Sequence, residues 1–269
     1  ILRYESKGRI HGHINQLRSD GGGTVSGRIS MANPNLQQIP SRNPVIAKMI
    51  RGLFLPEENQ QWASLDFDQQ EPRINLALMY GMGQTRLAEQ LDVSTDEAKR
   101  LMVQYHTDVP FVKELQEVVQ RRVSHKAGSG FIRSLLGRKC RFNLWEPNLF
   151  VSSKALQKAE ALIEYGDNIK RAYTYRALNR LIQASAADQT KASMVEVHKQ
   201  TGKVPLVQIH DELAFSVEDQ KEAESLCVVM EKGAPLQVPT PCDISLGPSW
   251  GDLKKVDFKD ISRIIPEED

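Results

Sequence analysis

The sequence lacks long apolar runs, has few cysteines and carries almost no net charge. No stretch reaches the roughly 18 apolar residues of a membrane-spanning helix, so we expect neither a membrane span nor a signal peptide. The three cysteines, Cys140, Cys227 and Cys242, are odd in number and show no CxxC spacing. This cysteine usage favours a reduced, intracellular compartment, and we expect a cytoplasmic protein.

The formal net charge of +1 gives no global sign of a nucleic-acid partner. A local basic surface would serve such a partner equally well. Local basic clusters are present, and each could also be a solvated face: Arg121, Arg122, His125 and Lys126, then Arg133, Arg138, Lys139 and Arg141. With 269 residues, 40% of them hydrophobic and 26% charged, the chain has a globular composition and the length for two subdomains.

The pattern along the chain predicts a mixture of strands and helices. Residues 1–45 indicate loops and short strands, and residues 61–67 indicate a strand with an acidic residue near its carboxyl end. Residues 85–123 are typical of helix, with a helix start at 94–97, and a second long helix is predicted over 153–173. Residues 205–217 hold two apolar runs around a polar tip, which indicates a hairpin.

Acidic residues fall at two predicted strand ends, Asp66 and the pair Asp211-Glu212. A carboxylate on a strand rich in large apolar residues is costly to bury unless a cation compensates it. Bound Mg²⁺, which prefers oxygen ligands, would do so. Each position could also be an exposed turn residue or a salt-bridge partner. Spacing alone leaves both interpretations open.

Five short motifs occur in order over nearly the whole chain. In sequence order they are Ser26-Gly27-Arg28-Ile29-Ser30 with Pro34-Asn35-Leu36-Gln37-Gln38-Ile39-Pro40, Asp66-Phe67-Asp68-Gln69-Gln70-Glu71-Pro72-Arg73, Gly130-Phe131 with Leu136-Gly137-Arg138-Lys139, Asn179 and Gln183 with Ala186-Ala187-Asp188, and His210-Asp211-Glu212. They resemble the TGR…PNLQNIP, DYSQIELR, G-Y/F…GRR, NxxxQ…AAD and HDE motifs of family A DNA polymerases. One such motif would be weak, whereas five in the right order are specific.

The resemblance implies an α+β fold of the right-hand polymerase type. An antiparallel palm sheet with packed helices would be built from residues 1–74, which include the end of the thumb, and from residues 174–269. A helical fingers subdomain would be inserted at residues 75–173. The implied activity is template-directed DNA synthesis, in which deoxynucleoside triphosphates extend a primer 3′-hydroxyl by two-metal nucleotidyl transfer. The implied partner is primer–template DNA.

The same resemblance implies a role for each catalytic residue. Asp66 and Asp211 would bridge two Mg²⁺ ions, with the Phe67 carbonyl as a further ligand. Glu212 would support this site without ligating strongly. Glu71 would act as a steric gate, because its side chain would pack where a ribose 2′-hydroxyl lies.

Further residues would hold the two substrates. The residues implied at the incoming nucleotide are Gln69, Leu76 and Tyr80, together with the gate at Glu71. Arg28 and Gln183 would donate hydrogen bonds to minor-groove acceptors that all correct base pairs share, so the contact would check geometry and not sequence. The residues implied beside them are Asn179 and, at the primer end, His210.

The match is interrupted in the fingers. Family members carry a helix of the pattern R-x3-K-x3-F/Y-x3-Y-G, but residues 75–81 resemble only its last two turns and directly follow Ile74. We infer that Ile74 and Asn75 are not neighbours in the whole protein and that a fingers segment is missing between them. The alternative is a real deletion, which would remove the Arg and Lys that hold the triphosphate. The other departures are Leu76 for Phe or Tyr, Tyr175 for Arg, and Pro72 for Leu.

Other functions share parts of this pattern. A two-metal nuclease would need the same carboxylates but no gate, so Glu71 and Tyr80 argue against it. A non-catalytic nucleic-acid-binding remnant stays open because of the absent Arg and Lys, although the retained carboxylates argue against it. A single-subunit RNA polymerase would lack a bulky Glu at the gate. The stretch from about 142 to 173 resembles phage replicative members more than bacterial repair enzymes, and for a phage protein the host cytoplasm is expected.

Overall fold

The computed structural model describes residues 2–17, 23–41, 43–67, 83–124, 128–149, 153–238 and 240–258. The chain divides into two compact units, one formed by Ile1–Gln69 with Ala186–Asp269 and the other by Gln70–Ser185. Helix α7 (Ala177–Thr201) contributes residues to both units. None of the helices in the described ranges combines the length and apolar character that crossing a bilayer requires.

The first unit is built on a five-stranded antiparallel sheet. Its strand order is β11-β12-β5-β13-β14, with bounds Val207–Ile209, Glu212–Val217, Gln61–Phe67, Cys242–Ser249 and Asp252–Val256. The predicted strand over 61–67 and the predicted hairpin over 205–217 are both confirmed. The sheet therefore pairs the predicted strand with the predicted hairpin, although some 140 residues of sequence separate them.

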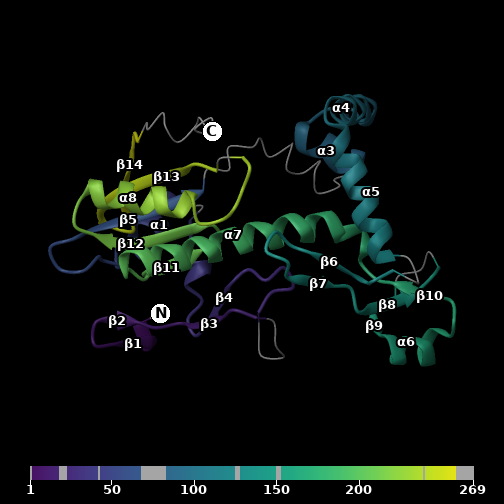
Figure 1. The fold of residues 1–269 in the computed structure, drawn as a ribbon, viewed down its shortest axis with the longest axis horizontal. Helices are drawn as coiled ribbons and strands as arrows, with labels where there is room; N and C mark the ends of the chain where they lie inside the picture. The colour runs from purple at the N-terminus through teal and green to yellow at the C-terminus, as the bar shows by residue number, and fades with distance from the viewer. Residues whose placement is uncertain are drawn as a thin grey trace. The chain divides into compact units, whose positions relative to one another are not determined.

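Alternating side chains give the sheet one fully apolar face. Leu65, Leu213 and Phe215 lie on it and are completely buried. Helix α8 (Gln220–Glu231) lies along this face (Figure 1), and α7 contributes Val197 to the same core. The other face contributes Trp62, Ala214, Val207 and Ile209 to a second core and also carries Asp66 and Glu212.

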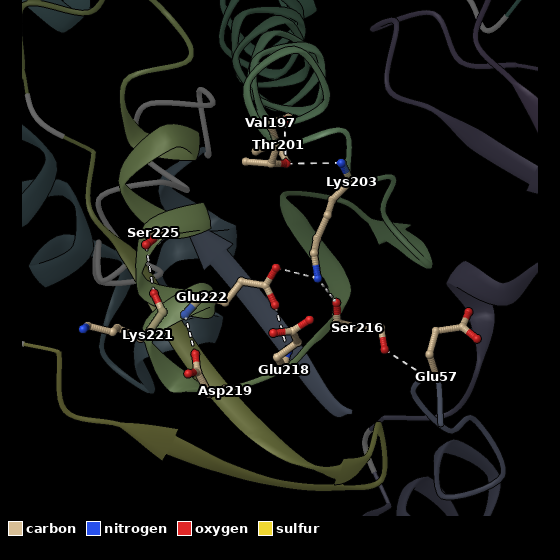
Figure 2. A network of polar contacts seen from close by, with 10 residues as sticks. All are labelled: Glu57, Val197, Thr201, Lys203, Ser216, Glu218, Asp219, Lys221, Glu222 and Ser225. Atoms are coloured by element: carbon tan, nitrogen blue, oxygen red, sulfur yellow. Dashed lines mark hydrogen bonds and ion pairs between the residues drawn. The ribbon is translucent and has the colours of Figure 1, made fainter. Parts of the chain in front are cut away.

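The amino end of α8 is anchored by a polar network (Figure 2). Asp219 caps the helix by accepting a hydrogen bond from the Glu222 N–H at 2.8 Å. Lys203, which follows α7, forms an ion pair with Glu222 at 2.7 Å and donates to the Ser216 carbonyl at 2.7 Å. The Ser216 hydroxyl accepts from the Glu57 N–H at 2.8 Å. The network thus ties α8 to β12 and to the loop before β5.

Short elements precede the sheet. Their bounds are η1 Leu2–Tyr4, β1 Glu5–Ser6, β2 Arg9–Ile10, β3 His13–Asn15, β4 Ser30–Ala32, η2 Leu36–Gln38 and α1 Pro44–Arg51. Strands β1 and β2 pair with each other, as do β3 and β4. The amide side chain of Asn43 caps α1, and Pro44 occupies its first position, where a missing N–H costs nothing. The prediction of loops and short strands for this region is confirmed.

The second unit combines helices with two small antiparallel sheets. Its helices are α3 Gln84–Leu91, α4 Thr95–Asp108, α5 Pro110–Ser124, α6 Lys158–Tyr165 and η3 Thr174–Arg176. Strands β6 (Phe131–Arg133) and β7 (Lys139–Arg141) form a hairpin. Strands β8 (Leu144–Pro147), β9 (Leu156–Gln157) and β10 (Ile169–Arg171) form a sheet in the order β10-β8-β9. The predicted helix start is confirmed, because the Ser94 hydroxyl caps α4 at the Glu97 N–H.

The prediction of one long helix over 153–173 is wrong. Helix α6 ends at Tyr165 because Gly166 adopts a positive φ of 70° that a continuing helix cannot contain. The residues on either side of α6 are instead strands β9 and β10, both paired with β8. The region expected to be mostly helical therefore contains substantial sheet, and the chain as a whole is a mixed helix and sheet protein with antiparallel strands.

Candidate active site

The register of the central sheet aligns three carboxylates across three strands. Asp66 on β5 pairs directly with Glu212 on β12 and with Asp243 on β13. Directly opposed residues share a face, and their Cβ atoms lie about 5 Å apart. The three side chains therefore stand in one row at the end of the sheet face that Trp62 closes at the other end.

Asp211 lies at the same end of the sheet, in the hairpin turn. Ile209 pairs with Glu212, so His210 and Asp211 alone form the two-residue turn between β11 and β12. His210 has a φ of 56°, a left-handed conformation that costs a non-glycine residue on the order of 1 kcal/mol. The turn thus places Asp211 next to the row that contains Asp66, and Phe67 is the last residue of β5 beside them.

A glutamine from the N-terminal region holds this turn. The Gln37 side-chain nitrogen lies 3.2 Å from the Ile29 carbonyl, from the Gln208 carbonyl and from the Gln208 side-chain oxygen. The Gln208 side chain in turn donates to the His210 carbonyl. Two of the sequence motifs are therefore linked physically, because Ile29 is adjacent to Arg28 and Gln208 precedes His210 by two residues.

Two further contacts set the electrostatics of the row. The Ser64 hydroxyl, buried on the same face of β5, donates to the Glu212 carboxylate. Lys255 on β14 forms an ion pair with Asp243 at 2.7 Å. Serine thus fixes the orientation of Glu212, and lysine compensates the charge of Asp243. Asp66 itself is exposed, while Asp211 and Glu212 are partly buried.

The donor set fits Mg²⁺, which binds carboxylate oxygens and keeps water and phosphate ligands. Among the described residues, only a separate group of Cys227, Glu231 and Cys242 brings three candidate ligand atoms within 4.8 Å of one another. The carboxylates at the end of the sheet do not form such a group of three.

The second unit contains Asn179 and Gln183, which lie one turn apart on α7 and are both partly buried. The β6–β7 hairpin packs on this helix. Arg138 donates to the Ala184 carbonyl at 2.9 Å, and the Ser185 hydroxyl accepts from the Leu135 N–H at 3.1 Å. Two sequence motifs of this unit, the glycine–arginine hairpin and the Asn–Gln helix, are therefore in direct contact.

Several predicted site residues lie outside the described residues, which resume only at residue 83 after Phe67. These are Gln69, Glu71, Leu76 and Tyr80, together with the Ile74–Asn75 junction. Sequence reasoning missed Asp243 and Ser64. A signal for Asp243 exists, since it is the one acidic residue in the alternating strand Cys242-Asp243-Ile244-Ser245-Leu246. Its place opposite Asp66 depends on strand order, which the sequence does not display.

The fold matches a solved polymerase structure. The POL domain of Pol1 from M. smegmatis, solved in complex with DNA primer-template and dNTP, has a TM-score of 0.70 to this chain and 28% identity, covering 92% of this chain and 49% of that one. Together with this match, the antiparallel sheet and its clustered carboxylates define the class of the chain as a polymerase-domain fold.

The curated relatives are DNA polymerases. A DNA-directed DNA polymerase of Pseudomonas phage M6 is 30% identical, covering 91% of this chain and 47% of the relative. DNA polymerase DpoZ of Salmonella phage PMBT28 is 27% identical over 93% of this chain and 49% of the relative, and the thermostable DNA polymerase I of Thermus aquaticus is 25% identical over 94% and 34%. The chain spans about half the length of the two phage relatives and 34% of the Thermus aquaticus relative.

The family model for DNA polymerase family A matches residues 2–78 and 72–252, which is most of the chain. The chain belongs to DNA polymerase family A. The two matched segments meet at 72–78, where the motif pattern is interrupted. The alignment to the phage M6 protein runs over 338 positions, more than the 269 residues of this chain, so that relative contains segments that this chain lacks.

Proposed function

We propose that this chain is the polymerase core of a DNA-directed DNA polymerase, which adds deoxyribonucleotides to a primer 3′-hydroxyl by two-metal nucleotidyl transfer. The observation that carries the proposal is the pairing of Asp66 with Glu212, with Asp211 in the adjoining two-residue turn. Carboxylates far apart in sequence thereby meet at one end of the sheet. Membership of DNA polymerase family A indicates that their task is nucleotidyl transfer.

Asp66 and Asp211 would hold two Mg²⁺ ions, with the Phe67 carbonyl as a further ligand. Bound metal ions supply activation of the primer 3′-hydroxyl and neutralisation of the triphosphate in such a reaction. Glu212, oriented by the Ser64 hydroxyl, supports the two aspartates. Asp243 adds negative charge to the row, and its ion pair with Lys255 limits the repulsion that this charge imposes on Asp66.

The remaining site residues are assigned by resemblance. Arg28 and Gln183, assisted by Asn179, would contact the minor groove of the primer–template end, and His210 would contact the primer terminus. The linkage of Gln37 to both Ile29 and Gln208 supports a shared task for Arg28 and His210. The incoming nucleotide would be held by Gln69, Glu71, Leu76 and Tyr80.

We assign the right-hand architecture on the same basis. Residues 1–74 and 174–269 would form the palm, with the end of the thumb in the first segment, and residues 75–173 would belong to the fingers. The phage relatives support a place in DNA replication within the host cytoplasm.

The function is tested by primer extension with the full-length polypeptide, an annealed primer–template, four deoxynucleoside triphosphates and Mg²⁺. Template-directed lengthening of the primer is the expected result. A two-metal nuclease would shorten the primer, and a non-catalytic remnant would bind the duplex and leave it unchanged. Either of these results would overturn the proposal.

Glu71→Ala is expected to raise ribonucleotide incorporation relative to deoxyribonucleotide incorporation. Removing the gate side chain vacates the space of the ribose 2′-hydroxyl, and a steric clash relieved in this way is worth roughly 1.4–2.7 kcal/mol, or about 10- to 100-fold in the ratio. Single-nucleotide kcat/KM values for the ribo and deoxy substrates measure it, with Glu89→Ala on helix α3 as the control. An unchanged ratio would remove the gate assignment.

The intact mass of the protein from its natural source tests the Ile74–Asn75 junction. We expect a mass well above 30.3 kDa, which is the mass of the 269 residues alone, because a fingers segment would lie between these two residues. Peptide mapping across the junction should then show that residues 74 and 75 are separated. A mass near 30.3 kDa would instead establish a real deletion and would weaken the assignment of efficient DNA synthesis.

A further inference from the structure

Three side chains of metal-ligand type meet between α8 and β13, away from the carboxylate row. Cys227 and Glu231 lie one turn apart on the same face of α8, and Cys242 is the first residue of β13. Their sulfur and carboxylate ligand atoms all lie within 4.8 Å of one another. Among the described residues this is the one group of three that is so closely gathered.

We propose that Cys227, Glu231 and Cys242 form a binding site for a thiophilic divalent cation of the Zn²⁺ class. Two thiolates and one carboxylate are a donor set that zinc accepts in proteins, and it differs from the all-oxygen set that Mg²⁺ requires. The proposal does not rest on the proposed polymerase function.

The spacing fits a tetrahedral ion. With zinc–sulfur and zinc–oxygen bonds of usual length, a ligating sulfur and oxygen lie about 3.6 Å apart, and two ligating sulfurs about 3.8 Å. The Cys227 sulfur lies 3.8 Å from the Glu231 Oε1. Small side-chain rotations therefore suffice to bring all three ligands onto one ion. Because Glu231 is only partly buried, a water molecule is the natural fourth ligand.

The ligands are held in place by backbone contacts. The Cys242 N–H donates to the Glu231 Oε1 at 2.6 Å, which fixes the carboxylate beside the two sulfurs. The Cys227 thiol lies 3.5 Å from the Cys242 carbonyl and would give up its proton, and with it this contact, on ligating the ion. Outer contacts of this kind orient metal ligands in established sites, and their loss weakens metal binding. Here the backbone of one ligand residue, Cys242, orients the carboxylate of another, Glu231.

An ion at this location would fasten helix α8 to strand β13. Cys242 pairs with Phe67 on β5, and the next residue of β13, Asp243, pairs with Asp66. Neighbouring residues on a strand point to opposite faces, so the cysteine site lies under the carboxylate row. The polar network of Figure 2 fixes the amino end of α8. An ion at Cys227, Glu231 and Cys242 would fix its carboxyl end to the strand beside Asp66.

Titration of the full-length protein with Co²⁺ tests the site, because thiolate ligands give Co²⁺ a charge-transfer absorbance that oxygen ligands do not. We expect one equivalent to bind with this absorbance and Zn²⁺ to displace it. The signal should be lost in Cys227→Ala and Cys242→Ala and retained in Cys140→Ala, whose cysteine is equally buried but lies in the other unit. Circular dichroism checks that each variant is folded.

Glu231→Gln is the conservative variant, since its amide oxygen can still accept from the Cys242 N–H while the carboxylate charge is removed. Losing a charged ligand should cost at least as much as losing an outer partner of a ligand, so we expect Co²⁺ binding to weaken roughly tenfold or more. No charge-transfer signal in the folded wild type, or equal affinity in Glu231→Gln, would overturn the proposal and leave the two thiols as apolar packing groups. Loss of primer extension alone would bear on the polymerase proposal and not on this one.

Discussion

Asp66→Asn and Asp211→Asn are each expected to reduce primer extension by about a thousandfold or more, while binding of the primer–template duplex is retained. Asparagine keeps the size of the side chain and removes the negative charge that would hold the metal ions. A loss of about 4 kcal/mol of transition-state stabilisation, typical for a disrupted charge-stabilising site, corresponds to this factor. Single-turnover extension rates at saturating Mg²⁺ measure it.

The matched control is Asp108→Asn. Asp108 is the last residue of α4, and its carboxylate accepts a hydrogen bond from the Gln104 amide, which an asparagine oxygen can also accept. This variant should extend primers at the wild-type rate. Substantial extension by Asp66→Asn or by Asp211→Asn would remove that residue from the catalytic assignment. Unchanged extension in both variants would contradict the two-metal mechanism.

Glu212→Gln should have a smaller effect than either aspartate variant. The Ser64 hydroxyl donates to Glu212, so part of the binding capacity of this carboxylate is already used within the protein. A glutamine oxygen still accepts that bond. The order of effects in the three variants therefore separates ligands from a supporting residue, which their closeness in the fold does not do.

The elements that local chemistry specifies were predictable from the sequence. The bounds of β5 follow from an apolar run that ends at an acidic residue, and the start of α4 follows from Ser94 three residues before Glu97. The long helix over 153–173 failed because apolar spacing does not show that β8 supplies a pairing partner on either side of α6. Gly166 marked the break, but a lone glycine is compatible with a helix interior.

The motifs in the sequence predicted which residues belong to the candidate site but not how the fold brings them together. Asp66 and Asp211 stand out by their positions at strand ends, yet spacing left open whether they meet. Their meeting depends on β12 pairing with β5 across a long insertion, which is a property of the whole sheet. Asp243 escaped notice for the same reason, because only the placement of β13 on the other side of β5 brings it into the row.

Gly247→Ala is expected to destabilise the first unit by roughly 3 kcal/mol, near the upper end of the usual cost of overpacking. A Cβ at this position would collide with the Asp252 carbonyl oxygen and stand 3.1 Å from the Leu253 Cα, both of them backbone atoms. Strand β13 has little freedom to retreat, because Gly247 also pairs with Trp62 on β5. The clash can be relieved only by separating β14 from β13 or β13 from β5.

Gly83→Ala is the matched control, since a Cβ at Gly83 meets nothing within 4 Å and its φ of −74° is open to any residue. Gly83 is the N-cap of α3, where alanine is a poorer cap, so this variant should lower the free energy of unfolding by about 1 kcal/mol at most. Urea unfolding followed by circular dichroism compares the two. Because β13 carries both Asp243 and Cys242, Gly247→Ala should also lower primer extension and Co²⁺ affinity together. Equal stability of the two variants would mean that the β13–β14 pairing is looser than the close approach at Gly247 requires.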